Sequence, residues 1–420
     1  MKLLSQMQRD LTAPALAVNQ RPGRYGPDRP MRERVTLFAA FLALTEFAVF
    51  AFYVAGTHGL IVPLDHQVST DFVSFYAAGA LANAHTPWLA YDHAVHFAAE
   101  QAAVGSAIKY NYFYYPPVFL MICAPLARLP YLLAFVTLQA IAAVACWLAL
   151  NMIRRELPLL VFLAFPGLWW AIGTGQNALL SAALFAAGTA LVERRPVLAG
   201  LCLGALCYKP DMGLLIPVAL IAGGHWRAFL GAAGTVLALV GASFAWFGVA
   251  TWEAFLAAIP GAGDVYAGHA IFMGGLTSPF GALMTFGVGR GIAAVVQGCA
   301  ALLAATVVAV VWRRGGQAAL PVRAAILVAA TPVAVPMLMF YDLMLVLVAL
   351  VWISRVPPRP WLGAASVAVF LGPLLAGNFG GNAHWLVAFA AAAMTFALAV
   401  AVAWRDLPLP WTARAATGAA

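Results

Sequence analysis

Residues 35–56 have the sequence VTLFAAFLALTEFAVFAFYVAG, an apolar run long enough to cross a bilayer. A membrane-spanning helix needs about 20 mainly apolar residues, and similar runs recur as far as residue 404. The runs are continuous, whereas the strands of a membrane β-barrel alternate apolar and polar residues. Backbone groups in lipid must be hydrogen-bonded within the chain, so the sequence predicts an all-α polytopic membrane protein with roughly 10–13 transmembrane or re-entrant helices.

The composition supports the same class. Of the 420 residues, 64% are hydrophobic and 9% are charged, whereas a soluble domain is about 25% charged. The net charge of +8 is interpreted as basic residues on cytoplasmic loops, which orient the spans, and not as a nucleic-acid surface. The chain contains no phosphate-binding loop of the glycine-lysine-serine type and no HExxH zinc motif. We therefore expect no nucleotide cofactor, no metal and no nucleic-acid partner.

One membrane domain accounts for most of the chain. Residues 1–34 are predicted to be a disordered basic cytoplasmic tail, residues 35–404 a single transmembrane domain and residues 405–420 a second cytoplasmic tail. Within the domain, residues 58–115 are expected to form a first extracytoplasmic loop with amphipathic helices, and residues 250–275 a second outer loop. A multi-pass protein of a bacterial cytoplasmic membrane, with both termini inside, fits this pattern.

The first outer loop contains the segment TDFVSFYAAG at residues 70–79. Residues 72, 75, 76 and 79 share one face at helical spacing, which predicts a short helix at the membrane surface. Asp71 lies at the N-terminal end of this helix, where the helix dipole favours a carboxylate. Asp71 is therefore a candidate functional residue or simply part of a helix cap.

Two further breaks interrupt the apolar runs, at residues 173–177 and at Lys209-Pro210-Asp211. Half-helices that meet at a charged break are a recurrent way to build a site inside a membrane protein. Lys209 is thus a candidate site residue, and a structural ion pair with Asp211 is the alternative. The same features would suit a transporter or flippase for a polar or lipid-linked cargo. The lack of an internal repeat and the large acidic and aromatic outer loop count against that function.

Several short motifs follow one another in a fixed order. They are Asp71-Phe72-x-x-x-Tyr76-x-x-Gly79, Pro87-Trp88-x-x-Tyr91-Asp92, Tyr115-Pro116-Pro117, Gly175-Gln176-x-x-Leu179-Leu180, Lys209-Pro210 and Tyr341-Asp342-Leu343. Their order and spacing over residues 35–355 resemble glycosyltransferase family 87, the polyprenyl-phosphate-sugar-dependent mannosyltransferases and their relatives with a GT-C type fold.

The resemblance implies an active site on the extracytoplasmic side, in a cavity open to the outer leaflet. It implies a donor in which a sugar, usually mannose, is carried on a polyprenyl phosphate. It also implies an acidic catalytic base in the first outer loop, which maps onto Asp71. Many GT-C enzymes have paired acids in this loop, whereas Asp71 has no acidic neighbour, so this chain would be a single-aspartate version.

Chemistry leads to the same roles. Glycosyl transfer passes through an oxocarbenium-like state, and a positioned carboxylate can deprotonate the acceptor hydroxyl. The departing lipid phosphate needs a cation, for which Lys209 is the first candidate and Arg290 the second. Displacement by one base without a carboxylate nucleophile would invert the anomeric carbon. The residues expected to line the substrate cavity are Phe72, Tyr76, Trp88, Tyr91, Asp92, Tyr115, Gln176, Asn177, His269, Tyr341 and Asp342.

The identity of both substrates stays open at this point. The donor sugar is mannose or another polyprenyl-linked sugar such as arabinofuranose. The acceptor is a lipid-linked glycan, a phosphoinositide-type lipid, a polysaccharide or a protein. Because the donor is itself lipid-linked, no nucleotide-binding site is required.

Overall fold

The computed structural model describes residues 29–56, 71–105, 108–267, 273–315, 318–375 and 386–406. In these ranges the regular elements are helices, and one isolated antiparallel bridge joins Leu276 to Met339. Residues 1–28, 57–70 and 407–420 lie outside the described residues, and these ranges include most of the two predicted cytoplasmic tails. Residues 29–34 are helical and belong to α2, which begins at Arg29. Pro30 lies in the first turn of this helix, where proline is tolerated.

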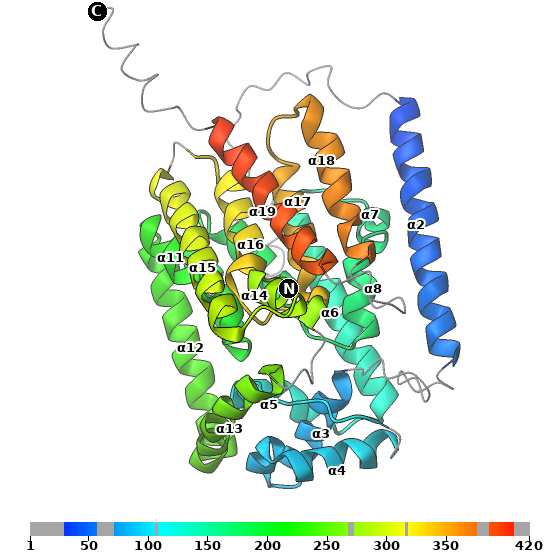
Figure 1. Ribbon diagram of the computed structural model, residues 1–420, viewed down its shortest axis with the longest axis vertical. Helices are drawn as coiled ribbons and strands as arrows, with labels where there is room; N and C mark the ends of the chain where they lie inside the picture. The colour runs from blue at the N-terminus through cyan, green and yellow to red at the C-terminus, as the bar shows by residue number, and fades with distance from the viewer. Residues whose placement is uncertain are drawn as a thin grey trace, which may run out of the picture.

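The main helices follow one another along the whole chain (Figure 1). They are α2 (Arg29–Gly56), α3 (Phe72–Asn83), α4 (His93–Val104), α5 (Pro117–Leu126), α6 (Tyr131–Ile153), α7 (Leu159–Leu163), α8 (Pro166–Gly173), α9 (Ala178–Leu191), α10 (Pro196–Ala205), α11 (Ile216–Ala222), α12 (Trp226–Phe247), α13 (Val249–Ala267), α14 (Pro279–Thr285), α15 (Arg290–Arg313), α16 (Leu320–Ala334), α17 (Met344–Ile353), α18 (Pro360–Leu371) and α19 (Val387–Asp406).

Short 3₁₀ turns join several of these helices. They are η1 (Pro87–Tyr91), η2 (Leu206–Tyr208), η3 (Pro210–Gly213), η4 (Met273–Gly275), η6 (Phe340–Leu343) and η7 (Gly372–Leu375). The break predicted at Lys209 is present, because α10 and α11 are separated by η2 and η3. The chain also breaks between α8 and α9 and between α16 and η6. Three pairs of short helices therefore contribute polar turns to the interior.

The helices match a membrane-spanning fold. Five helices in the described ranges are long and apolar enough to cross a bilayer, namely those over residues 33–52, 131–153, 226–247, 290–313 and 387–404. Shorter apolar helices of 10–17 residues accompany them. The helical elements and the five candidate spans confirm the all-α polytopic membrane fold expected from the sequence, and they are consistent with a fold of GT-C type.

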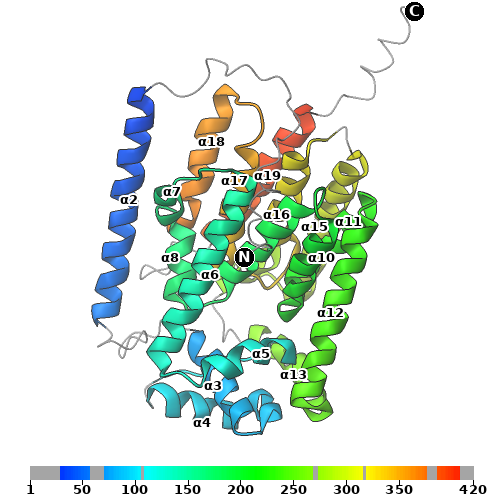
Figure 2. The ribbon, with the colours of Figure 1, turned by 180° about the vertical axis from the view of Figure 1, so that it is seen from behind.

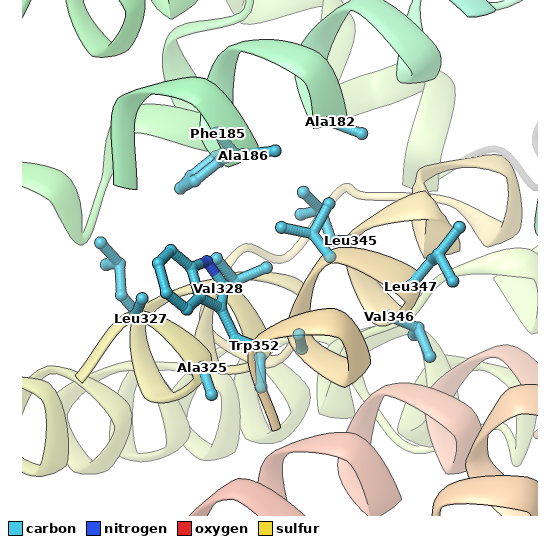
Figure 3. Close-up of a cluster of buried hydrophobic side chains, with 14 of the residues drawn as sticks. Ala182, Phe185, Ala186, Ala325, Leu327, Val328, Leu345, Val346, Leu347 and Trp352 are labelled. Carbon is cyan, nitrogen blue, oxygen red and sulfur yellow. The ribbon is translucent and has the colours of Figure 1, made fainter. Parts of the chain in front are cut away.

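The largest core surrounds α16 and α17. Residues 322–335 and 343–353 are buried throughout, which is expected of helices that are apolar on every face and enclosed by other helices. In Figure 3, Phe185 and Ala186 of α9 face Val328 of α16 and Leu345 of α17. The buried indole of Trp352 donates a hydrogen bond to Oγ1 of Thr189 (3.1 Å), so its one polar atom is satisfied.

A second, aromatic core lies at one end of the molecule, where α3, α4, α5 and α13 gather (Figures 1 and 2). Phe72 and Phe75 of α3 are almost fully buried there, and Phe75 packs edge-to-face on Phe119 of α5 with ring centroids 4.9 Å apart. The predicted second outer loop is helical over residues 249–267 and packs on η1 and α5. This end carries the first-loop motifs.

Gly79 fixes the distance between α3 and α5. A Cβ at residue 79 would overlap the carbonyl of Cys123 and would lie 2.9 Å from the Cβ of Ala127. We therefore expect Gly79→Ala to lower the free energy of unfolding by about 1–3 kcal/mol, as overpacking does in other cores. Thermal unfolding in detergent measures the effect. Gly234→Ala in α12, where an added Cβ meets nothing within 4 Å, is the control, and equal losses in both variants would contradict the prediction.

Candidate active site

Asp71 stands at the start of α3, but its side chain does not cap the helix. The residue occupies the N-cap position with helical angles (φ −57°, ψ −13°), and its carboxylate makes no capping hydrogen bond. The next residue, Phe72, is fully buried and packs edge-to-face on Phe135 of α6, with centroids 5.4 Å apart. The aromatic core thus anchors the backbone of Asp71 and leaves its side chain available for another partner.

That partner is Gln176, in the turn between α8 and α9. Gly175 has φ +68°, and a Cβ there would lie 2.6 Å from the Cβ of Phe72, so glycine allows this turn to pack on the start of α3. Nε2 of Gln176 donates a hydrogen bond to Oδ2 of Asp71. The proximity of two motifs that are 105 residues apart therefore depends on a glycine between them.

The orientation of the Gln176 amide is fixed by its other contacts. The hydroxyl of Tyr115 donates to Oε1 (3.1 Å), and the backbone N–H of Asn177 points at the same oxygen (3.3 Å). The nitrogen of the amide must then face Asp71, which acts as the acceptor. Oδ1 of Asp71 has no hydrogen-bond partner among the described residues, so one carboxylate oxygen is held and the other is open.

Lys209 and Asp342 form a buried ion pair beside Asp71. Nζ of Lys209 lies 2.7 Å from Oδ1 and 2.8 Å from Oδ2 of Asp342, and it also lies 5.5 Å from the centroid of the Tyr341 ring. The side chain of Asp211 instead accepts a hydrogen bond from the backbone N–H of Met212 (2.9 Å). The alternative left open by the sequence, a Lys209–Asp211 pair, is therefore not the pair that forms.

The protonation of Asp71 reflects this environment. Burial raises the pKa of its carboxyl from 3.8 to about 6, against the lowering effects of the Gln176 hydrogen bond and the charge of Lys209. Asp342 is close enough to raise the same pKa through charge repulsion. A carboxylate with a pKa near neutrality is suited to accept a proton in a reaction.

Asn177 adds a polar group with unused hydrogen-bonding capacity. The residue is fully buried at the start of α9, and neither Oδ1 nor Nδ2 of its amide has a hydrogen-bond partner among the described residues. The hydroxyl of Tyr115 lies near this amide. A buried amide without a partner is costly in a folded protein, and this one lies next to the Gln176–Asp71 contact, where a substrate hydroxyl could satisfy it.

A buried His96–Glu100 pair supports the far side of α3, and sequence reasoning missed it. Nε2 of His96 is 3.0 Å from the carbonyl oxygen of Ser74, and Oε2 of Glu100 accepts from the N–H of Asn111 (3.1 Å). Nδ1 of His96 lies 3.7 Å from Oε1 of Glu100. Burial raises the pKa of Glu100 to about 8 and lowers that of His96 to about 4, which favours the neutral form of each side chain. Their spacing of four residues was the available signal.

Two of the predicted lining residues belong to the support of the site. The hydroxyl of Tyr91 donates to the carbonyl of Tyr115 (2.9 Å), which connects the first-loop motif to the tyrosine that orients Gln176. The hydroxyl of Tyr76 donates to the carbonyl of Leu129 (2.9 Å). The structure therefore brings Asp71, Tyr115, Gln176, Asn177, Lys209, Tyr341 and Asp342 together, with Phe72, Tyr76 and Tyr91 behind them.

The remaining predicted residues lie elsewhere. Asp92 is the N-cap of α4, and its Oδ1 accepts from the N–H groups of Ala94 and Val95 (3.0 Å each). Trp88 is 41% exposed and lines a cavity whose other lining residues do not include Asp71 or its partners. Arg290 is exposed at the first residue of α15, and His269 lies outside the described residues. In the described part of the chain, no group of three His, Cys, Asp or Glu side chains is placed to hold a metal.

Comparison with known families gives one match. The model of glycosyltransferase family 87 matches residues 113–341, more than half of the chain. The matched range includes Tyr115, Gln176 and Lys209 and ends one residue before Asp342, whereas Asp71 precedes it. No curated protein and no solved structure matches the chain.

The Lys209–Asp342 pair should be strongly coupled. Lys209→Met or Asp342→Leu leaves the other charge buried without a partner, and we expect each to cost about 3–5 kcal/mol of stability. The double variant should recover most of that loss, because no unpaired charge remains. Thermal unfolding of the three variants in detergent forms a double-mutant cycle. Single variants as stable as the wild-type protein would show that the pair is solvated and not buried.

Proposed function

Because the chain belongs to glycosyltransferase family 87, it is a membrane glycosyltransferase, and we propose that it transfers mannose from a polyprenyl-phosphate donor to an acceptor hydroxyl, with Asp71 as the general base. The observation that carries this proposal is the Asp71 carboxylate, which Gln176 holds by one oxygen beside the Lys209–Asp342 pair. Since the matched family consists of glycosyltransferases, we do not pursue the alternative function of a transporter or flippase.

In the proposed reaction, the acceptor hydroxyl lies against the open oxygen of Asp71. The acceptor oxygen forms a bond with the anomeric carbon while its proton passes to Oδ1 of Asp71. The bond from the anomeric carbon to the phosphate oxygen breaks, and the polyprenyl phosphate leaves with the electron pair. Asp342 accepts two of the three ammonium protons of Lys209, so the third can donate to the departing phosphate.

A single displacement of this kind inverts the anomeric configuration. Retention by double displacement needs a second carboxylate as nucleophile, and Asp342, whose charge acts on Asp71, has both oxygens bonded to Lys209. Analysis of the anomeric configuration of the product by NMR tests this step. Retention would require a covalent intermediate and would contradict the single-base mechanism.

The distribution of basic residues supports an extracytoplasmic site. Helix α9 begins directly after Asn177 and is followed by Arg194 and Arg195, whereas α17 begins after Asp342 and is followed by Arg355. The site residues and the arginines therefore lie at opposite ends of the same helices. Since basic residues favour the cytoplasmic side, we place Asp71 on the outer side, where a lipid-linked donor is accessible.

Replacement of the base gives the most direct test. Asp71→Asn should reduce sugar transfer from radiolabelled polyprenyl-phosphate-mannose in membranes by about 10²–10⁴-fold, the usual contribution of a general base. Asp92→Asn is the matched control, because Asp92 only caps α4, so we expect it to keep wild-type transfer. Equal transfer by wild-type and Asp71→Asn proteins would remove Asp71 from the chemistry.

The transfer rate should also depend on pH. The base acts as a carboxylate, so with a pKa of about 6 for Asp71 the rate should be constant above pH 7 and fall about tenfold per pH unit well below 6. Gln176→Leu removes a hydrogen bond that lowers this pKa, so its midpoint should lie at higher pH. Initial rates between pH 5 and 8 measure both profiles. A midpoint that Gln176→Leu leaves unchanged would assign the titration to another group.

A further inference from the structure

A cavity lies at the ends of three helices, away from Asp71. It has a volume of about 350 Å³, and its lining includes Asn83, His85, Trp88, Arg128, Trp246 and Phe247. This volume is within the range of small-ligand sites, about 300–1,000 Å³. Asn83 ends α3, whereas Asp71 precedes it, so the cavity is about 18 Å from Asp71 along the helix axis. It is therefore separate from the candidate active site.

The surrounding helices place this cavity at the level of a membrane surface. Phe247 is the last residue of the candidate span α12, and the candidate span α6 begins at Tyr131, three residues after Arg128. Trp88 and Trp246 on its wall are 41% and 54% exposed. Tryptophan is enriched where lipid head groups meet the hydrocarbon, so the cavity opens at head-group depth.

Arg128 supplies an oriented cation. Its Nε is 3.4 Å from Oδ1 of Asn83, whose Nδ2 donates in turn to the carbonyl of Ala124 (2.8 Å). No carboxylate pairs with Arg128 in the described part of the chain. The guanidinium keeps its two terminal nitrogens for a ligand, and this fork geometry matches a phosphate group.

His85 occupies a backbone position that favours glycine. The residue has φ +61° and follows the end of α3, where its N–H donates to the carbonyl of Ala82 and the N–H of Thr86 donates to that of Leu81. This pair of hydrogen bonds is a Schellman motif, in which glycine is the usual residue at the position of His85. The chain instead places an imidazole there, on the wall of the cavity, against the local conformational preference.

The same cavity also has features that suit a positive group. Helices α3, α5 and α12 all end at it, and helix C-termini carry partial negative charge. The two exposed indoles offer aromatic faces to a cation. We propose that this cavity binds the head group of a zwitterionic phospholipid, with its phosphate at Arg128 and His85 and its amine toward the indoles and the helix C-termini.

Native mass spectrometry of the full chain in dodecyl maltoside tests the proposal, with dioleoyl-phosphatidylethanolamine as the probe. We expect one tight site for this lipid, weakened at least tenfold by Arg128→Gln. His85→Gly should weaken binding without lowering the melting temperature, because glycine suits the backbone there. The control is Arg227→Gln, an exposed arginine at the other end of α12, which should bind like the wild-type protein.

Several outcomes would overturn the proposal. They are binding of dioleoyl-phosphatidylglycerol as tight as that of the ethanolamine lipid, unchanged binding by Arg128→Gln or His85→Gly, and an equal loss in Arg227→Gln. Displacement of the lipid by inorganic phosphate at the same concentration would make this a site for a soluble anion, and would also overturn it. Asp71→Asn should bind the lipid normally, so this result is independent of the proposed reaction.

Discussion

The need to satisfy backbone hydrogen bonds within the membrane determines where polar side chains can gather in this protein. A continuous helix satisfies its own backbone, whereas a break is tolerated only where it is enclosed by protein or lines a cavity. Three of the breaks in the described helices matter here: the one between α8 and α9, the one at η2 and η3, and the one at η6. They supply Gln176, which donates a hydrogen bond to Asp71, and Lys209 and Asp342, which form the ion pair beside it.

The Lys209–Asp342 ion pair and the Asp71–Gln176 hydrogen bond affect the site in different ways. Lys209, which lies between η2 and η3, pairs with Asp342 of η6, so the two charges balance each other. A buried ion pair is weak evidence for stability, so we interpret this one as fixing the position of the two turns. Asp71 has a neutral hydrogen-bond partner, Gln176, and forms no ion pair with Lys209, so burial outweighs the lowering effects of both on its pKa. Burial can then raise that pKa to about 6. The lysine is thus close enough to influence the carboxylate without forming an ion pair with it.

The sequence allowed much of this to be predicted, because lipid imposes strong rules. The helical class follows from the apolar runs, and the breaks at Gln176 and Lys209 follow from their polar residues. The partners across the chain were not predictable. Lys209 has Asp211 two residues away, yet it pairs with Asp342, which is 133 residues further along the chain, because the tertiary fold brings the two together. Likewise, the His96–Glu100 pair became evident only once burial was known. Periodicity indicates which face of a helix is apolar, but not which neighbouring helix it meets.

The first-loop motifs contribute to the site mainly through support. Tyr91 fixes the carbonyl of Tyr115, Tyr115 orients the amide of Gln176, and Gln176 holds Asp71. Asp92 caps α4, the helix that carries His96, and Nε2 of His96 contacts the carbonyl oxygen of Ser74. An Asp and an aromatic residue in a loop therefore do not by themselves indicate contact with a sugar. Among the described residues of this loop, Asp71 has one carboxylate oxygen bonded to the Gln176 turn and the other without a partner, whereas Asp92 uses its carboxylate on its own helix. This difference in partners, and not in residue type, distinguishes the candidate base from the structural acid.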